Sequence, residues 1–229
     1  MTWNKMKNCL AEFIGTFILV FAGTSAIVVN DLNGGVVTHV GISLVFGLIV
    51  LAIIYTIGDI SGAHINPAVT IAFWWAGRFP AHQVLPYVIS QISGALVASI
   101  IVNLQFSGHQ TLGATIPIAG QQQAFILETI LTFILMLVVI NVSTGAKEKG
   151  LIAGIAIGSV IATEALFAGP ITGASMNPAK SIGPAIISGQ MQYLWIYLIA
   201  PVCGAILAIF SCRFMHEGNC CQPVTSQNR

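Results

Sequence analysis

Two copies of the tripeptide Asn-Pro-Ala are the part of this sequence whose residue types and spacing suggest a chemistry. They are Asn66-Pro67-Ala68 and Asn177-Pro178-Ala179. Asparagine is a favourable residue just before a helix, and proline is tolerated at the first helical position because its missing N–H would have no partner there. Each tripeptide therefore predicts the start of a short helix, and a single copy would need no other explanation.

The segments before the two tripeptides, residues 61–64 and 172–175, are small and polar and suit extended backbone. At membrane depth, such backbone survives only where it lines a cavity or is buried in protein. We therefore expect each half of the chain to supply a loop that re-enters the membrane, followed by a half-helix. The residues expected to line a pore are Gly62, Ala63, His64, Gly173 and Ser175. For His64, packing without a pore role is the alternative.

Two half-helices that meet at the centre of a membrane would favour neutral solutes over cations. Their N-termini carry the positive ends of helix dipoles. Asn66 and Asn177 could donate hydrogen bonds to a passing water or hydroxyl group, and the carbonyls before each tripeptide could accept them. A cation, including a hydrated proton, would meet electrostatic repulsion there. The pattern predicts a channel for small uncharged molecules.

The composition requires lipid as the main solvent. Of the 229 residues, 56% are hydrophobic and 7% are charged, with a mean hydropathy of +0.89, whereas soluble domains carry about 25% charged residues. The net charge of +1 gives no reason to expect a nucleic-acid partner. The five histidines are scattered, and no pattern supplies a metal cage or a nucleophile with a base. We therefore expect no cofactor, no metal and no enzymatic activity.

Six long apolar segments predict an all-α membrane protein with six transmembrane helices and two re-entrant half-helices. A spanning helix needs roughly 20 apolar residues. The segments lie at about 9–29, 39–57, 84–104, 124–142, 151–168 and 193–214. The apolar stretches after Asn66 and Asn177 hold about ten residues each and are too short to span.

The basic residues predict which side of the membrane each connection occupies. Seven of the eight lysines and arginines lie in the chain termini, in the connection between the second and third spans, or in that between the fourth and fifth. An excess of these residues marks the cytoplasmic side. We therefore expect an integral protein of the cell (plasma or inner) membrane with both termini in the cytoplasm and a flexible cytoplasmic tail over residues 215–229. The exception is Lys180.

The chain also repeats itself. Residues 11–19 resemble residues 127–135, an offset of 128 − 12 = 116, and residues 61–68 resemble residues 172–179, an offset of 177 − 66 = 111. We interpret this as two repeats, at about 8–104 and 124–214, within a single channel domain over residues 1–229. Each repeat has three spans, an odd number, so the second enters the membrane upside down. Inverted repeats of this kind place their functional site near the midplane.

Glu12 and Glu128 occupy equivalent places in the two repeats. An ionisable residue within a span is a functional candidate by default. One interpretation is that each carboxyl binds backbone N–H groups of a re-entrant loop. The other is a proton relay, or a coupling site of a secondary transporter in which Glu164 would also take part. For Glu164, beside Ala165, an orientation towards another helix and an electrostatic influence on the pore both stay open.

The segments Ser-Gly-Ala-His-Ile-Asn-Pro-Ala-Val-Thr (61–70) and Gly-Ala-Ser-Met-Asn-Pro-Ala (173–179) resemble the signature loops of the major intrinsic proteins, which are aquaporins and glycerol facilitators. The resemblance covers about residues 8–214, and residues 167–179 are especially similar to plant nodulin-like intrinsic proteins and their bacterial relatives. It implies the aquaporin fold, passive transport of water and small neutral solutes across a lipid bilayer, and glutamates that bind the loops. It also implies a homotetramer with one pore per subunit.

In this family four positions form the narrowest point of the pore, the selectivity filter, and the resemblance assigns them to Phe46, Ala165, Ala174 and Lys180. Selective water channels typically have Phe, His, a small residue and Arg there, and glycerol facilitators have Trp, Gly, Phe and Arg. Ala165 and Ala174 imply an opening wider than that of strict water channels, so that glycerol or urea could pass. Lys180 departs from the family, because Arg offers five donors in a rigid fork and Lys offers three on a flexible stem.

Two questions about the filter stay open at this level. The Lys180 side chain could point along the pore, swing out to the extracellular mouth or partly block passage, and a neutral exchange of one cation for another is the simplest alternative. The solute is the second question. Four residues resemble those of water channels and favour a water-selective pore, namely Phe46, Ser181, Ala185 and Tyr197.

Overall fold

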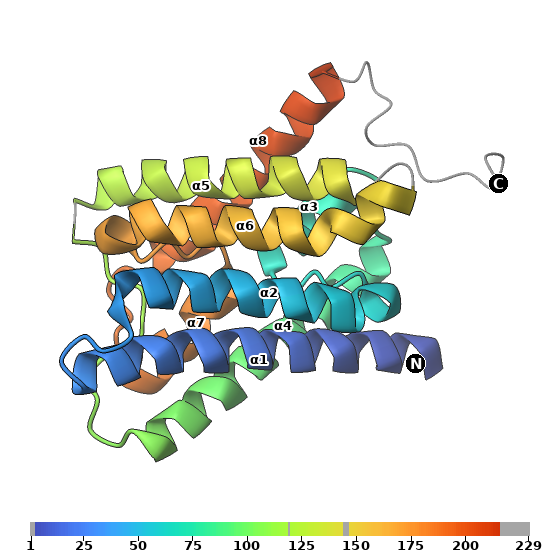
Figure 1. The fold of residues 1–229 in the computed structure, drawn as a ribbon. Coiled ribbons are helices and arrows are strands. Elements are labelled where there is room, and N and C mark those ends of the chain that lie inside the picture. The colour runs from blue at the N-terminus through green and yellow to red at the C-terminus, as the bar shows by residue number, and fades with distance from the viewer. Residues whose placement is uncertain (1–2, 119, 144–146, 216–229) are drawn as a thin grey trace, which may run out of the picture.

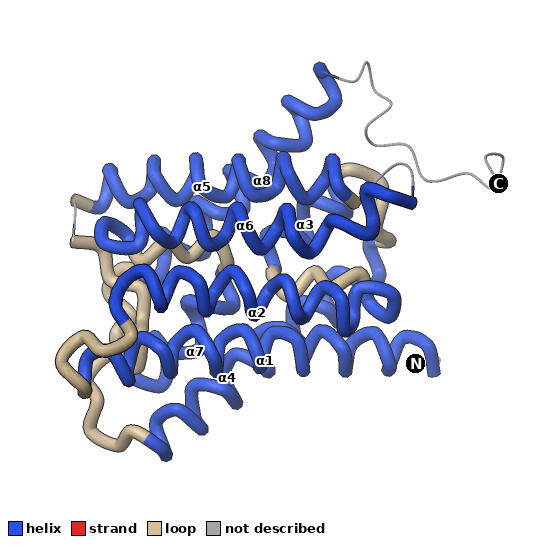
Figure 2. Tube along the Cα trace, viewed as in Figure 1, coloured by secondary structure: helices blue, strands red, loops and turns tan. Residues whose placement is uncertain are grey.

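The computed structural model of the chain describes residues 3–118, 120–143 and 147–215. Within these ranges it contains eight helices and no strand. Figure 2 shows the helices in blue and the loops that connect them in tan. The helices are α1 (Trp3–Leu32), α2 (Thr38–Ser61), α3 (Pro67–Trp75), α4 (Ala81–Gln105), α5 (Gln121–Val142), α6 (Lys147–Thr172), α7 (Pro178–Ser188) and α8 (Leu194–Met215). Of the predicted flexible tail, residues 216–229 lie outside the described residues.

Six of these helices are long and apolar enough to cross a membrane: α1, α2, α4, α5, α6 and α8. The prediction of six spanning helices is confirmed in the part of the chain that the structure describes. The helices run beyond the predicted apolar segments, since α1 begins at Trp3 and α6 ends at Thr172. Hydropathy marks only the hydrocarbon core, whereas a helix continues into the interface with its backbone hydrogen bonds satisfied internally.

The two predicted half-helices are α3 and α7, which have 9 and 11 residues. At 1.5 Å per residue each is roughly 15 Å long, about half the thickness of the hydrocarbon core. Both begin at the proline of an Asn-Pro-Ala tripeptide, Pro67 in α3 and Pro178 in α7, with the asparagine as N-cap residue. The predicted fold class is therefore confirmed.

The helices form two sets, α1–α4 and α5–α8, with matching internal contacts. In the first set α1 packs on α4 and α2, and in the second α5 packs on α8 and α6. The sets meet through α2 and α6, and in Figure 1 the helices α1, α2, α6 and α5 follow one another as a layer. Each half-helix also packs on a span of the other set, α3 on α8 and α7 on α4. These exchanged contacts are those of an inverted repeat.

The two ends of the bundle differ in what they carry. One end holds the start of α1 and the end of α8 and is called the terminal face below (Figure 1). The other end holds the connection between α1 and α2 and the connection between α4 and α5, and is called the distal face. Because six spans separate the two ends of the described chain, those ends lie on the same face.

Two glycines allow α2 and α6 to cross in close contact. A Cβ atom added at Gly47 would lie 2.5 Å from the carbonyl oxygen of Gly158, and one added at Gly158 would lie 2.6 Å from the carbonyl oxygen of Gly47. Small residues at a crossing point let membrane helices approach until their backbones touch. Any larger residue here would push apart the two helices that carry Phe46 and Ala165.

A proline inside α6 leaves one carbonyl group without its helical partner. Pro170 has no N–H, so the Leu166 carbonyl, four residues earlier, cannot accept the usual helical bond. The Nε2 atom of His39, at the start of α2, lies 2.6 Å from that oxygen. The contact satisfies a backbone group that would be costly to leave unpaired in a membrane, and it ties α2 to α6 near the distal face.

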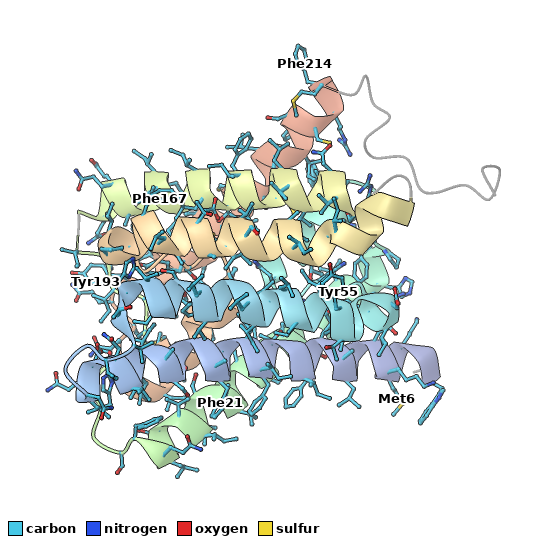
Figure 3. All side chains as sticks on the ribbon, in the orientation of Figure 1. Met6, Phe21, Tyr55, Phe167, Tyr193 and Phe214 are labelled. Carbon is cyan, nitrogen blue, oxygen red and sulfur yellow. The ribbon has the colours of Figure 1, made fainter. Side chains whose placement is uncertain are left out.

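The outward side chains of the spans are apolar. Examples of exposed large apolar residues are Met6, Leu48, Leu85, Ile126, Phe167 and Phe214. Figure 3 shows Met6 and Phe214 projecting away from the bundle. Soluble monomers rarely expose a contiguous apolar surface of this extent. The chain is therefore an integral membrane protein.

Candidate functional site

A cavity of about 130 Å³ lies where the two half-helices meet the spans α1, α2, α5 and α6. This volume holds several water molecules. Its lining includes ten of the residues predicted from sequence: Phe46, Gly62, Ala63, His64, Asn66, Ala165, Ala174, Ser175, Asn177 and Lys180. Gly173 and the Pro-Ala pairs of the two tripeptides are not among the lining residues in the described chain.

The asparagine side chains join each loop to the opposite half of the molecule. Asn66 Nδ2 donates to the carbonyl oxygen of Met176 at 2.8 Å. Asn177 Nδ2 donates to the carbonyl oxygen of Ile65 at 2.9 Å. The two residues also cap their own half-helices, because each side-chain oxygen accepts from the N–H two positions further on, at 2.9 and 3.0 Å. The N-termini of α3 and α7 are thereby held against each other.

Each asparagine amide keeps one N–H for a solute. The amide group has two N–H donors, of which one binds the opposite loop, while the oxygen caps the helix. Because Asn66 and Asn177 both line the cavity, the remaining donors can bind a passing oxygen atom. With the positive ends of two helices beside them, these donors suit a neutral oxygen-bearing molecule and disfavour a cation.

Glu12 is fully buried in α1 and binds the first re-entrant loop. Its Oε1 atom accepts from the Ser61 hydroxyl at 2.7 Å and from the His64 N–H at 2.9 Å. Its Oε2 atom accepts from the Ile65 N–H at 2.6 Å and from the Gln91 amide at 2.8 Å. Hydrogen bonds to a carboxylate are roughly twice as strong as neutral ones, so this single side chain holds the loop in position.

Glu128 makes the equivalent contacts with the second loop. Its Oε1 atom accepts from the Thr172 hydroxyl at 2.7 Å and from the Ser175 N–H at 2.9 Å. Its Oε2 atom accepts from the Met176 N–H at 2.9 Å. Neither Glu128 nor Glu12 is among the residues that line the cavity in the described chain. This geometry fits loop support and offers no contact with a solute that coupling would need.

The loops contain four non-glycine residues with left-handed backbone. The φ angles are +47° at Ala63, +43° at Ile65, +39° at Ala174 and +53° at Met176. Such conformations cost on the order of 1–3 kcal/mol each and persist only where the surroundings enforce them. The glutamates bind the N–H groups of Ile65 and Met176. These buried charge-assisted bonds therefore offset the strain of the loops.

Two tyrosines at equivalent positions bind the ends of the spans that lead into the loops. The Tyr87 hydroxyl donates to the Ser61 carbonyl oxygen at 2.9 Å, and the Tyr197 hydroxyl donates to the Thr172 carbonyl oxygen at 2.6 Å.

Ser181 is also buried, and its hydroxyl group is hydrogen-bonded to the hydroxyl groups of Thr115 and Ser175. Tyr197 and Ser181, which resemble residues of water channels, thus have structural roles that do not depend on the solute.

His64 lies among aromatic rings on the terminal side of the asparagines. Its ring stacks on Phe73 with 4.8 Å between the centroids. The Thr70 hydroxyl donates to the Asn66 carbonyl oxygen at 3.1 Å, so it is the acceptor in its 3.1 Å contact with His64 Nδ1. The neutral imidazole then carries its proton on Nδ1, and its Nε2 atom can accept a hydrogen bond from a solute.

The Lys180 ammonium lies beside Phe46, another of the four residues assigned to the filter from sequence. Its Nζ atom donates to the Gly173 carbonyl oxygen at 3.0 Å and lies 5.2 Å from the centre of the Phe46 ring. The side chain is only 3% exposed, so it does not swing out to the mouth. A cation held over an aromatic face gains roughly 0.5–2 kcal/mol. Ala165 and Ala174, whose side chains are single methyl groups, also line the cavity.

Glu164 faces the packing between helices rather than the cavity. It is 3% exposed and is not among the lining residues in the described chain. Val160 and Ala168, one turn before and after it, pack in an apolar cluster with Leu131 and Leu135 of α5. Neither carboxyl oxygen has a hydrogen-bond partner among the described residues. The orientation towards another helix, one of the two interpretations left open from sequence, is the one observed.

Three polar residues of the site were not recognised from the sequence. Gln91 donates to Glu12 and, at 3.0 Å, to the Thr70 hydroxyl. Tyr87 could have been found, because it lies 197 − 87 = 110 residues before Tyr197, close to the offset of the repeat. Thr115 lies in the connection between the two predicted repeats, so no repeat signal points to it.

Several known proteins resemble this chain in sequence or in fold. The model of the family described as Major intrinsic protein matches residues 1–211. The chain is 46% identical to Nodulin-26 of Glycine max over 202 residues, which are 88% of this chain and 74% of that protein. It is 45% identical to Aquaporin NIP1-2 of Oryza sativa subsp. japonica over 214 residues, which are 90% of this chain and 70% of that protein. Among solved structures, the aquaglyceroporin from Plasmodium falciparum superimposes with a TM-score of 0.81 at 27% identity, covering 90% of this chain and 94% of that one.

Proposed function

Because the chain belongs to the major intrinsic protein family of passive channels for water and small solutes, we propose that its pore conducts uncharged molecules of the size of glycerol and urea as well as water, and excludes ions and protons. The observation that carries the proposal is the filter, where Ala165 and Ala174 add only methyl groups beside Phe46 and Lys180. By resemblance, a strict water channel has a histidine at the position of Ala165. The similarity in fold to an aquaglyceroporin supports the wider pore.

We propose that the filter has one polar side and one apolar side. Lys180 uses one N–H on the Gly173 carbonyl, and an ammonium has three donors, so two remain for solute oxygens. The carbon atoms of a polyol can then pass along Phe46 and the two alanines. Beyond the filter, Asn66 and Asn177 offer further donors. A neutral solute gives up its hydrogen bonds with water when it enters the pore. These groups replace those bonds one after another along the pore, so the free-energy barrier to permeation stays low.

Cations are excluded by the same groups. Two unit charges about 5 Å apart repel each other by roughly 3 kcal/mol at an effective dielectric constant of about 20. Lys180 opposes a cation at the filter, and the N-termini of α3 and α7 oppose it at the centre. We propose that proton exclusion depends on both barriers.

The roles of the remaining residues belong to the same proposal. Glu12 and Glu128 support the loops, and the pore runs past both Asn-Pro-Ala tripeptides in one channel domain built from two repeats. The distal face is extracellular, with both termini in the cytoplasm of a cell whose plasma or inner membrane holds the protein. The resemblance to the family further implies a homotetramer with one pore per subunit.

A water-selective pore is the second candidate function. Phe46 favours this function, because selective water channels typically have phenylalanine at the equivalent position. Ser181 and Tyr197 do not distinguish a water-selective pore from a wider one, since both make buried hydrogen bonds that hold other parts of the protein in place.

Flux through the purified protein in proteoliposomes tests the proposal. Stopped-flow light scattering should show uptake of water, glycerol and urea by the wild type above that of empty liposomes. The variant Ala165→His adds an imidazole to the filter and should lower glycerol and urea flux at least about tenfold, which corresponds to about 1.4 kcal/mol in barrier height. Water flux should change far less.

The control is Lys180→Arg, which keeps the charge of the filter and should keep proton exclusion. Rapid water flux without any glycerol or urea uptake by the wild type would leave the water-selective pore as the function. Solute flux that requires a proton gradient would contradict passive conduction.

A further inference from the structure

The connection between α4 and α5, described here over residues 106–118, reaches from the distal face into the bundle. Leu112 is buried and packs with Val28 of α1 and Val102 of α4. Its N–H donates to His109 Nδ1 at 3.0 Å. At the far end of the connection, the Ile118 N–H donates to the Ile171 carbonyl oxygen at 3.0 Å. The segment between these two anchor points is therefore held in a fixed place.

Thr115 lies between the anchor points and starts a chain of hydroxyl groups. Its Oγ1 atom donates to Ser181 Oγ at 2.7 Å. Ser175 Oγ lies 2.6 Å from Ser181 Oγ and donates to the Asn177 carbonyl oxygen at 3.0 Å. Because the Ser175 proton is used on that carbonyl, Ser181 is the donor to Ser175. The chain thus runs in one direction from Thr115 to the asparagine of the second tripeptide.

Thr115 also touches the residue that holds Lys180. A Cβ atom added at Gly173 would lie 3.0 Å from Thr115 Cγ2, so the threonine methyl packs directly on this glycine. The Gly173 carbonyl accepts from Lys180 Nζ. Ser181, the other partner of Thr115, follows Lys180 in α7. Thr115 therefore contacts Gly173, which binds the ammonium end of the Lys180 side chain. It also contacts Ser181, which adjoins the backbone end of that side chain.

In the first half of the molecule, a different residue donates a hydrogen bond to the hydroxyl group that is equivalent to that of Ser181. There the Thr70 hydroxyl, at the position equivalent to Ser181 (181 − 70 = 111), accepts from the Gln91 amide of α4 at 3.0 Å. The offset of 110 that relates Tyr87 to Tyr197 makes Pro201 of α8 the counterpart of Gln91. Proline has no polar side chain, so α8 cannot supply the donor. Thr115, from outside both repeats, supplies it instead.

We propose that Thr115 is a positioning residue of the selectivity filter. Its hydroxyl group, through Ser181, and its contact with Gly173 keep the Lys180 ammonium in one place over Phe46. The inference rests on the proposed function, since it names the element that sets the selectivity of that same filter. Lysine has a flexible stem with fewer donors than arginine, so this filter depends on its surroundings to locate the charge.

The test compares two substitutions at one position. Thr115→Val keeps the shape and the methyl contact with Gly173 and removes the hydroxyl group, whereas Thr115→Ser keeps the hydroxyl group. Loss of one buried hydrogen bond changes a free energy by about 0.5–1.5 kcal/mol. We expect Thr115→Val to raise the ratio of glycerol flux to water flux about three- to tenfold in proteoliposomes. Thr115→Ser keeps the hydrogen bond to Ser181, so its ratio should stay much closer to that of the wild type than the ratio of Thr115→Val. Thr111→Val, in the same connection, is the matched control.

A second variant keeps the inference testable if Thr115→Val does not fold. Ser181→Ala removes the other end of the same bond and should raise the same ratio. The double variant should then differ little from either single one, because the residues act as one unit. A structural role alone would lower all fluxes together with the thermal stability and leave the ratio unchanged, which would overturn the inference. An identical effect of Thr115→Ser and Thr115→Val would also overturn it.

Failure of the proposed function gives a different result. If the wild type conducts water but no glycerol, the proposal of a wide pore fails. In that case a gain of glycerol flux by Thr115→Val still supports positioning of the filter by Thr115, and no gain refutes it.

Discussion

Three glutamates are buried among the described residues, and they differ in how many hydrogen bonds their carboxyl oxygens accept. Glu12 accepts four hydrogen bonds and Glu128 accepts three. Both carboxyls hold the strained loops next to the pore. Glu164 accepts none from the described residues, although it is also buried. A carboxyl group without hydrogen-bond partners inside a membrane protein lowers stability. We therefore expect Glu164 to lower the free energy of unfolding.

Replacement of Glu164 by isoleucine should stabilise the protein. The equivalent position of the first repeat holds Ile53, since 164 − 111 = 53, so the change copies a side chain that the same architecture already accommodates. We expect Glu164→Ile to raise the free energy of unfolding by about 1–3 kcal/mol, because the unpaired polar group is removed. Thermal unfolding in detergent, followed by tryptophan fluorescence, measures the change.

Glu164→Gln is the control for this substitution, because it removes the ionisable group and keeps a polar side chain that still lacks partners. Its stability should stay near that of the wild type. Lower stability of Glu164→Ile, or a loss of water flux, would mean that the carboxyl has an essential partner such as a bound water molecule.

At the scale of elements, the pore depends on how close α2 and α6 approach. The Gly47–Gly158 crossing sets the separation of the helices that carry Phe46 and Ala165. We therefore expect a change in the separation of α2 and α6 to change the width of the proposed filter.

A methyl group at the crossing should disturb both stability and flux. In Gly47→Ala the new Cβ atom would lie 2.5 Å from the Gly158 carbonyl oxygen, so the helices must separate. Overpacking of this kind costs typically about 1–3 kcal/mol, and we expect a lower temperature of thermal unfolding. Gly58→Ala, in the same helix, places its Cβ atom 4.0 Å from the nearest side chain and should be neutral or stabilising. Equal effects of the two variants would contradict the importance of the crossing.

At the scale of the whole molecule, both ends of the described chain lie on one face, and the proposed function assigns that face to the cytoplasm because most basic residues of the sequence lie there. The proposal predicts that the distal face is reached from outside the cell. Val36, in the connection between α1 and α2, is 68% exposed on the distal face, and His82, at the start of α4, is exposed on the terminal face.

Single cysteines at these two positions test the orientation in a background without the native cysteines. A maleimide that cannot cross membranes should label Val36→Cys on intact cells and His82→Cys only after permeabilisation. The reverse pattern would mean that the positive-inside rule fails for this protein and that the filter faces the cytoplasm.

The sequence alone predicted the elements of this protein well. Six apolar runs of spanning length, two asparagine caps followed by proline, and a repeat with an odd number of spans are all local patterns. Each is set by interactions with the solvent or within a few residues of backbone. The half-helices α3 and α7 could therefore be located to the residue at their first turn, and the inverted arrangement followed from counting.

The tertiary structure alone decided how the filter is held. Lys180 could take several directions by its own flexibility, and its place is fixed by Phe46 and Gly173. Thr115 meets Ser181 across 66 residues of chain from a connection outside both repeats, and Glu164 faces α5 because of how the spans pack. These contacts join residues distant in sequence, and no local pattern encodes them, since they exist only once the helices have assembled.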